Sequence, residues 1–249
     1  METKGTEFDL KSVKGWYEFL IWMIKDIFTG WGKYEKWYAI GLVSLQIGFY
    51  ILYPDSLLGF ITGVSGTICV LLVAKRKLSN YFFGFIQTGI ALILGFQAGL
   101  IGETGENIFY FVSQLLGIKE WNKNKDEDDE VITKKFDLKQ WVITIAIIAG
   151  LTLALGFVFD MFSGTQPYID ALTLVIALVA QTLMVYRFRE QWLLWGLLNI
   201  VSLYQWITLG NMSLVAMYIA FLINTIYGYV NWSKEVALQE KEKENNHIA

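Results

Sequence analysis

The sequence is poor in the residues that carry most protein chemistry. Its 249 residues include one cysteine and one histidine, and only 17% of them are charged. A single cysteine, Cys69, excludes an intramolecular disulfide, and its place inside an apolar run predicts a small buried side chain. The single histidine, His247, lies at the polar C-terminal end, which excludes a buried histidine ligand or proton relay.

Motifs of catalysis and metal binding are also missing. The segment Gly63-Val64-Ser65-Gly66 does not match a nucleophile elbow, and one histidine cannot supply a histidine-pair metal motif. We therefore expect a protein that is not an enzyme, holds no metal or cofactor and binds no nucleic acid.

Apolar residues, in contrast, are abundant and occur in long runs. Hydrophobic residues make up 55% of the chain, aromatic residues 16%, and the mean hydropathy is +0.43. A helix needs about 20 residues to cross a hydrocarbon core of about 30 Å. We predict an all-α membrane protein with eight transmembrane helices at 37–53, 57–74, 81–100, 106–121, 138–159, 168–187, 192–209 and 213–232.

The distribution of positive charge predicts the orientation. With eight spans and a cytoplasmic N-terminus, all 20 Lys and Arg residues fall on the cytoplasmic side, as the positive-inside rule favours. Both termini are then cytoplasmic. This separation is why we retain the span at 106–121, although Glu106 and Gln114 make it polar.

The polar regions between spans have distinct compositions. Within the cytoplasmic N-terminus, 1–36, the segment Trp16–Phe28 mixes apolar and charged residues and predicts an amphipathic helix on the inner membrane surface. The acidic stretch in 122–137 predicts a solvated cytoplasmic linker, and 233–249 a cytoplasmic tail.

Two short motifs indicate an internal repeat. Gly84-x-x-Gln87 recurs as Gly196-x-x-Asn199, 112 positions later. Gly117-x-x-x-Trp121 recurs as Gly228-x-x-x-Trp232 at an offset of 111, which predicts one residue lost between the anchors, in the outer turn.

The repeat predicts the architecture. Two three-helix repeats, 57–121 and 168–232, have the same orientation, so the span 138–159 must return the chain across the membrane. The result is a 3+1+3 parallel-repeat core with one additional N-terminal span at 37–53. Parallel-repeat transporters place the substrate between the repeats, near mid-membrane. A purely structural repeat is the alternative.

Candidate site residues follow from helical spacing. Trp192, Trp195, Asn199, Ser202 and Trp206 form one stripe, and an amide among indoles is favourable in a cavity but costly against lipid. Trp192 could equally be an interfacial belt residue, and Trp206 a belt or gate residue.

Further amides and two tyrosines occupy similar depths in the other spans. The amides could instead join helices by hydrogen bonds, at about 0.6 kcal/mol per contact. We predict a substrate-binding set of eight residues: Trp192, Trp195, Asn199, Gln87, Gln114, Asn224, Tyr110 and Tyr227.

The middle of the predicted membrane region carries no Lys, Arg, His or close carboxylate pair. Ion-coupled carriers usually need such groups. Glu106 and Asp170 lie near the outer ends of their spans and are weak candidates for coupling. We therefore expect facilitated diffusion.

Two segments resemble a known family. They are Lys77-x-Ser79-Asn80-Tyr81-Phe82-Phe83-Gly84-x-x-Gln87 and Glu190-x-Trp192-Leu193-Leu194-Trp195-x-x-x-Asn199. They resemble PnuC vitamin transporters, and the similarity runs from about Leu57 to Trp232.

The resemblance implies a SWEET-like fold, a homotrimer in the bacterial inner membrane, and uptake of nicotinamide riboside. A cytoplasmic kinase would trap the product by phosphorylation. Trp192, Trp195, Asn199 and Gln87 match the motif positions of the family and inherit a substrate-binding role from it.

The chemistry of the predicted site limits the substrate. Indole rings attract a cationic pyridinium, whereas a phosphorylated mononucleotide would require Lys or Arg in the path. Thiamine, which is also cationic and aromatic, remains an alternative substrate, and riboflavin fits less well. A membrane sensor or scaffold that does not transport remains an alternative function.

Overall fold

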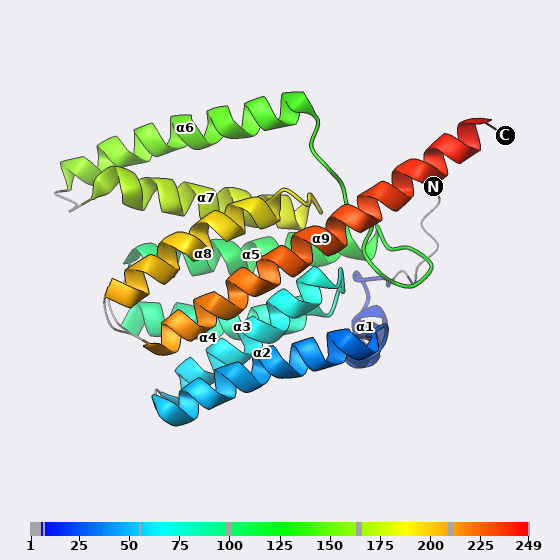
Figure 1. Ribbon diagram of the computed structural model, residues 1–249, viewed down its shortest axis with the longest axis horizontal. Helices are drawn as coiled ribbons and strands as arrows, with labels where there is room; N and C mark the ends of the chain where they lie inside the picture. Colours follow the sequence, from blue (N-terminus) through cyan, green and yellow to red (C-terminus); the bar gives the residue numbers. More distant parts are fainter. Residues whose placement is uncertain are drawn as a thin grey trace.

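The computed structural model describes residues 6, 8–54, 56–97, 101–162, 166–208 and 212–248. This part of the chain is helical, and Figure 1 shows how its helices are arranged. The helices are α1 (Val13–Phe28), α2 (Lys33–Leu52), α3 (Leu57–Ala74), α4 (Asn80–Gln97), α5 (Ile101–Asn122), α6 (Leu138–Met161), α7 (Pro167–Val185), α8 (Gln191–Thr208) and α9 (Met212–Ile248).

Local sequence signals begin several of these helices. The side chain of Ser56 accepts a hydrogen bond from the backbone of Gly59 at 3.0 Å and caps α3. Asp137 and Gln140 form a reciprocal capping box at the start of α6. Such caps satisfy backbone N–H groups that have no partner within the helix. They fix where the apolar helices begin.

Helices α2 to α9 lie side by side along one direction (Figure 1). In the order α3, α4, α5, α7, α8, α9, each helix packs against the next, and α9 packs against α3. These six helices therefore form a closed bundle. Outside it, α2 covers the contact between α3 and α9, and α6 packs against α7.

Three of the described helices are apolar and long enough to cross a membrane by length and composition alone, namely α3, α6 and α7. Half of the most apolar segment of α3 and of α7 is buried, but only 6% of that of α6. The exposed apolar surface of α6 suits contact with lipid. The other predicted spans are less apolar because they carry polar side chains, such as Gln114 in α5.

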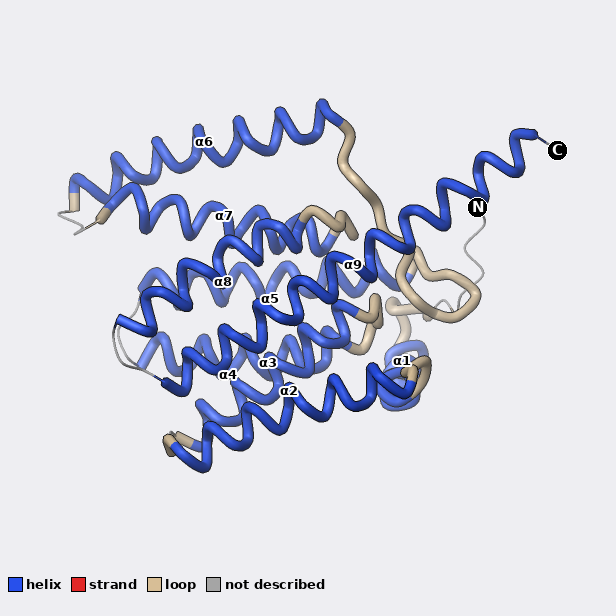
Figure 2. The backbone as a smooth tube through the Cα atoms, viewed as in Figure 1, coloured by secondary structure: helices blue, strands red, loops and turns tan. Residues whose placement is uncertain are grey.

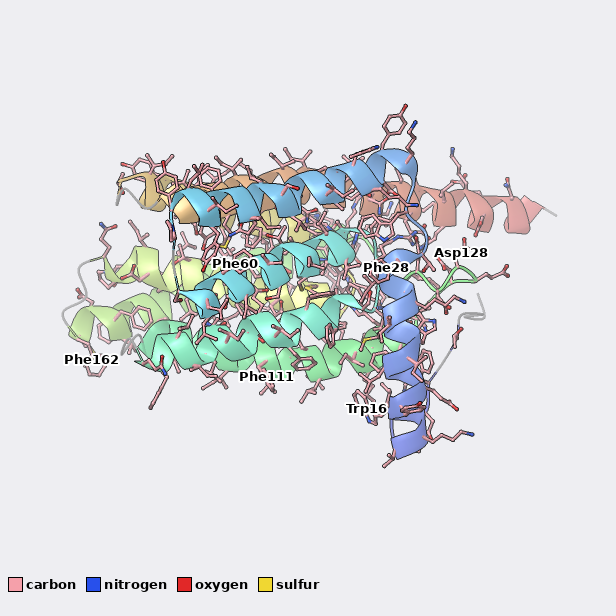
Figure 3. The ribbon with its side chains drawn as sticks, turned by 90° about the horizontal axis from the view of Figure 1, so that it is seen from below. Trp16, Phe28, Phe60, Phe111, Asp128 and Phe162 are labelled. Atoms are coloured by element: carbon pink, nitrogen blue, oxygen red, sulfur yellow. The ribbon has the colours of Figure 1, made fainter. Side chains whose placement is uncertain are left out.

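The amphipathic segment predicted at Trp16–Phe28 lies within α1, which crosses the bundle direction at one end of the molecule (Figure 3). Phe19 and Met23 are buried against the bundle, whereas Ile24 and Phe28 are exposed. Asp26 on the buried face pairs with Lys77 at 3.0 Å, so α1 is held to the turn between α3 and α4.

The structure adds detail to two regions that the sequence predicts to be cytoplasmic. The linker predicted as solvated at 122–137 is an irregular loop in Figure 2, yet Lys125 and Val131 within it are buried. The ammonium group of Lys125 lies over the ring of Trp22, 4.4 Å from its centroid. The predicted tail, 233–249, continues α9 as helix to Ile248, because charged residues with high helix propensity extend the last span.

Candidate functional site

Reciprocal contacts join the two halves of the bundle. The indole of Trp121 on α5 donates to the carbonyl of Met184 on α7 at 3.1 Å, and that of Trp232 on α9 donates to Val73 on α3 at 3.0 Å. Each residue of the first pair lies 111 positions before or after its counterpart in the second. The two Trp rings also meet, with centroids 5.9 Å apart.

The two motif glycines, Gly117 and Gly228, have equivalent surroundings at the same offset of 111. A Cβ atom at Gly117 would overlap the ring of Tyr81, and one at Gly228 would overlap the ring of Trp192. Tyr81 and Trp192 are themselves 111 positions apart. In each half, glycine therefore lets an aromatic ring from the neighbouring helix pack directly on the backbone.

Trp192 belongs to this aromatic cluster. It is only 3% exposed, and its ring packs edge-on against Trp232 at 5.9 Å. Its indole nitrogen has no hydrogen-bond partner among the described residues. Trp192 is therefore buried among other aromatic rings, whereas the alternative interpretation as an interfacial belt residue would expose it to lipid.

Two amides lie farther along the bundle, each bonded to a threonine in its own half. Gln114 on α5 donates to Thr88 on α4 at 3.0 Å, and Asn199 on α8 donates to Thr225 on α9 at 3.1 Å. The second pair again follows the first by 111 positions. In these hydrogen bonds Thr88, rather than the neighbouring Gln87, takes the place of Asn199. A Cβ atom at Gly84 would meet Gln114 and one at Gly196 would meet Thr225, so the predicted match of the two glycines stays a prediction.

Gln114 also presents an unused acceptor. Its Oε1 atom is buried and has no hydrogen-bond partner within the described part of the chain. A Cβ atom at Gly84 would lie 2.6 Å from this oxygen, so only glycine leaves room for the oxygen against the backbone of α4. A buried acceptor of this kind is costly unless something binds it.

Gln87 lies beside this region rather than within it. Its side chain is half-buried and packs against α3, where a Cβ atom at Gly66 would lie 3.0 Å from the amide carbon.

An aromatic pair bridges the two halves. Tyr110 on α5 and Trp195 on α8 have ring centroids 6.1 Å apart. The hydroxyl of Tyr110 donates to Glu106, one turn away on α5. Sequence reasoning selected Tyr110 and Trp195 separately, and the structure brings them together. The side chain of Trp206 lies outside the described residues.

Asn224 and Tyr227, by contrast, lie where α9 meets α2 and α3. Asn224 accepts from the hydroxyl of Tyr38 at 3.3 Å and donates to the carbonyl of Val70 on α3 at 2.8 Å. Tyr227 donates to Glu35 at 2.5 Å. Lys75 pairs with Glu35 at 2.9 Å. Burial raises the pKa of Glu35, which precedes the predicted span, but the hydrogen bonds from Tyr227 and Gly32 and the charge of Lys75 outweigh it and lower the pKa below 4.5.

Sequence reasoning missed the partners of the selected amides. Thr88 and Thr225 hold Gln114 and Asn199, and the hydroxyl of Ser113 accepts from Gln181 of α7 at 2.9 Å. The signal was present, because Ser113 and Gln181 are polar residues inside predicted spans.

Two apolar grooves lie on the outside of the bundle. One, of about 180 Å³, is lined by α5 and α7 residues that include Phe109, Ser113 and Tyr186. The other, of about 380 Å³, lies between α6 and α7. Neither of these two grooves is lined by a predicted site residue.

Comparison with known proteins gives a consistent result. Residues 56–234 match the model of the nicotinamide mononucleotide transporter family. The nicotinamide riboside transporter PnuC of Haemophilus influenzae is 37% identical over 217 residues, which cover 85% of this chain and 95% of the relative. The PnuC of Neisseria mucosa is 31% identical over 240 residues, which cover 91% of each protein.

A solved structure agrees with these relatives. A crystal structure of the vitamin B3 transporter PnuC superposes with a TM-score of 0.77 at 31% identity, covering 88% of this chain and 98% of that chain. The predicted resemblance is confirmed: the chain belongs to the nicotinamide mononucleotide transporter family, together with the PnuC transporters.

Proposed function

We propose that this protein takes up nicotinamide riboside by facilitated diffusion, binding it between the two halves of the bundle. The observation that carries the proposal is the contact between Tyr110 on α5 and Trp195 on α8. Gln114, whose side-chain oxygen has no hydrogen-bond partner among the described residues, lies on α5 four residues after Tyr110. The two PnuC relatives are named for this substrate.

The chemistry of these groups suits the riboside. Its pyridinium ring is cationic and flat, and aromatic faces attract such a cation by about 2 kcal/mol when it is desolvated. The Oε1 atom of Gln114 can accept a hydrogen bond from a ribose hydroxyl or from the carboxamide. Binding would thus satisfy an acceptor that is otherwise buried without a partner.

The riboside is favoured over the mononucleotide of the family description. A phosphate group is usually held by Arg or Lys. Between Lys77 and Lys119, and again between Arg189 and Lys234, the sequence contains neither residue. These two intervals include Trp195, Asn199 and Gln114, so the site has no obvious partner for a phosphate.

The eight-span, 3+1+3 arrangement is part of the proposal. Reciprocal contacts at an offset of 111 support two equivalent halves, α3 to α5 and α7 to α9, joined by α6 and preceded by α2. Transport by such a bundle would require the halves to move apart on one side and then on the other.

The oligomeric state, membrane and cytoplasmic partner that the family resemblance implies are also part of the proposal. The protein would be a homotrimer in a bacterial inner membrane, with both termini cytoplasmic, and a cytoplasmic kinase would phosphorylate the imported riboside. The buried lysines and arginines at the α1 end of the bundle suit a cytoplasmic location for that end.

Liposome uptake tests the function. Purified protein in liposomes should equilibrate labelled nicotinamide riboside without a proton or sodium gradient, and unlabelled riboside should drive counter-flow. Accumulation above the outside concentration without a kinase would contradict facilitated diffusion. Binding without counter-flow would instead indicate a sensor, and stronger competition by thiamine would reassign the substrate.

A further inference from the structure

Glu106 is the carboxylate tied to the aromatic pair of the candidate site. It lies on α5, four residues before Tyr110, so the two side chains share one face of the helix. The hydroxyl of Tyr110 donates to its carboxylate, and the ring of Tyr110 meets that of Trp195, 6.1 Å away between centroids. A negative charge is therefore linked directly to the rings.

Along α5, Glu106 lies before Tyr110 on the proposed path of the substrate from outside. In the proposed orientation α5 begins at the outer surface, so Glu106 lies about 6 Å nearer that surface than Tyr110, at 1.5 Å per residue. A solute from outside would meet the carboxylate before the rings. The carboxylate is partly buried, and its field is less screened than that of an exposed group.

The charge around the outer end reinforces this arrangement. The predicted outer turns contain Asp55, Glu103 and Asp160 and no Lys or Arg. A mouth of one sign raises the local concentration of oppositely charged solutes and lowers that of like-charged ones. Glu106 would continue this acidic field to the binding site.

We propose that Glu106 is a specificity determinant, which selects the cationic pyridinium of the riboside and disfavours neutral or phosphorylated relatives. The inference rests on the proposed function and extends it. Aromatic rings bind neutral and cationic flat molecules alike, whereas a carboxylate distinguishes them by charge. Glu106 thus serves substrate selection rather than ion coupling.

The test compares two ligands that differ mainly in charge. Binding of cationic nicotinamide riboside and of its neutral 1,4-dihydro form is measured by calorimetry on the full-length protein in nanodiscs. Glu106→Gln keeps the size and an acceptor for Tyr110 but removes the charge. We expect it to weaken binding of the cation about tenfold, a loss of about 1.4 kcal/mol, and that of the neutral form less than twofold.

Two further variants serve as controls. Asp170→Asn removes an exposed carboxylate at the start of α7 and should leave both affinities unchanged. Glu106→Asp keeps the charge and should retain the preference for the cation, even if Glu106→Gln fails to fold. Equal losses for both ligands in Glu106→Gln, or a lost preference in Glu106→Asp, would overturn the role of Glu106. Failure of the unsubstituted protein to bind either ligand would instead overturn the proposed function.

Discussion

The α1 end and the interior of the bundle hold their polar groups in different ways. At the α1 end, buried charges are paired between elements far apart in sequence, as in Lys77 with Asp26 and Arg187 with Glu120. In the interior, Gln114 and Asn199 each bond to a threonine in the same half, and Gln114 keeps one acceptor unused.

This difference separates a region that holds the halves together from a candidate binding region. The Arg187–Glu120 pair and the indole–carbonyl bonds of Trp121 and Trp232 join the two halves at the α1 end. In the interior the halves are joined by neutral amide bonds, from Gln181 to Ser113 and from Asn224 to the Val70 carbonyl, and by the contact of Tyr110 with Trp195. We therefore expect substitutions of the charged pairs at the α1 end to change stability, and substitutions at the aromatic pair to change binding.

The largest effect on stability should come from breaking the Lys77–Asp26 pair. Both side chains are less than 5% exposed, so Lys77→Met leaves a buried carboxylate without its cation. We expect a loss of about 3–5 kcal/mol, seen as a large fall in melting temperature in detergent. Lys14→Met, which removes an exposed pair with Glu18, is the control and should change little. Equal melting temperatures for the two variants would contradict the stabilising role of the buried pair.

The sequence predicted an all-α membrane protein because long apolar runs indicate helices that contact lipid. The direction of the helices, which the positive charges indicate, stays a prediction. The Gly117 and Gly228 motifs marked equivalent positions, and the structure explains them by the rings that pack on them.

The finer assignments could not be made from the sequence. The motif Gly84-x-x-Gln87 does not say which side chain is bonded, and Thr88, the next residue, is the partner of Gln114. Asn224 and Tyr227 lie where α9 meets α2 and α3, and the sequence does not say which neighbour a helix face meets. Lys125 looked solvated because its contact with Trp22 is long-range.

The next largest effect should be on binding. Trp195→Ala removes one ring of the pair between the halves, so nicotinamide riboside should bind at least tenfold more weakly, a cost of about 1.5 kcal/mol or more. Calorimetry measures the affinity, and the melting temperature should fall less than in Lys77→Met. Unchanged affinity would move the site away from the pair.

A smaller effect on binding, with almost no effect on stability, is expected at Gln114. Gln114→Leu removes the unused acceptor along with the bond to Thr88, so the two effects on folding nearly cancel, within about 1 kcal/mol. Riboside affinity should fall about threefold to tenfold, because the acceptor for the ligand is gone. A clear loss of stability with normal affinity would make Gln114 a structural residue.

The smallest effect concerns Glu35 and pH. Because its pKa is lowered in the folded protein, the stabilisation is present above pH 4.5 and is lost as pH falls below that value. Tyr227→Phe removes one hydrogen bond to the carboxylate and should weaken this pH dependence, with a cost of about 1 kcal/mol at neutral pH. Melting temperatures between pH 4 and pH 7 measure it, and an unchanged profile would exclude the contribution of Tyr227.

The most direct measurement is an experimental structure of the protein with nicotinamide riboside bound. We predict that the pyridinium ring lies against Tyr110 and Trp195, with a ligand hydroxyl or amide donating to the Oε1 atom of Gln114. A ligand held instead beside α2, among Tyr38, Asn224 and Tyr227, would contradict the account.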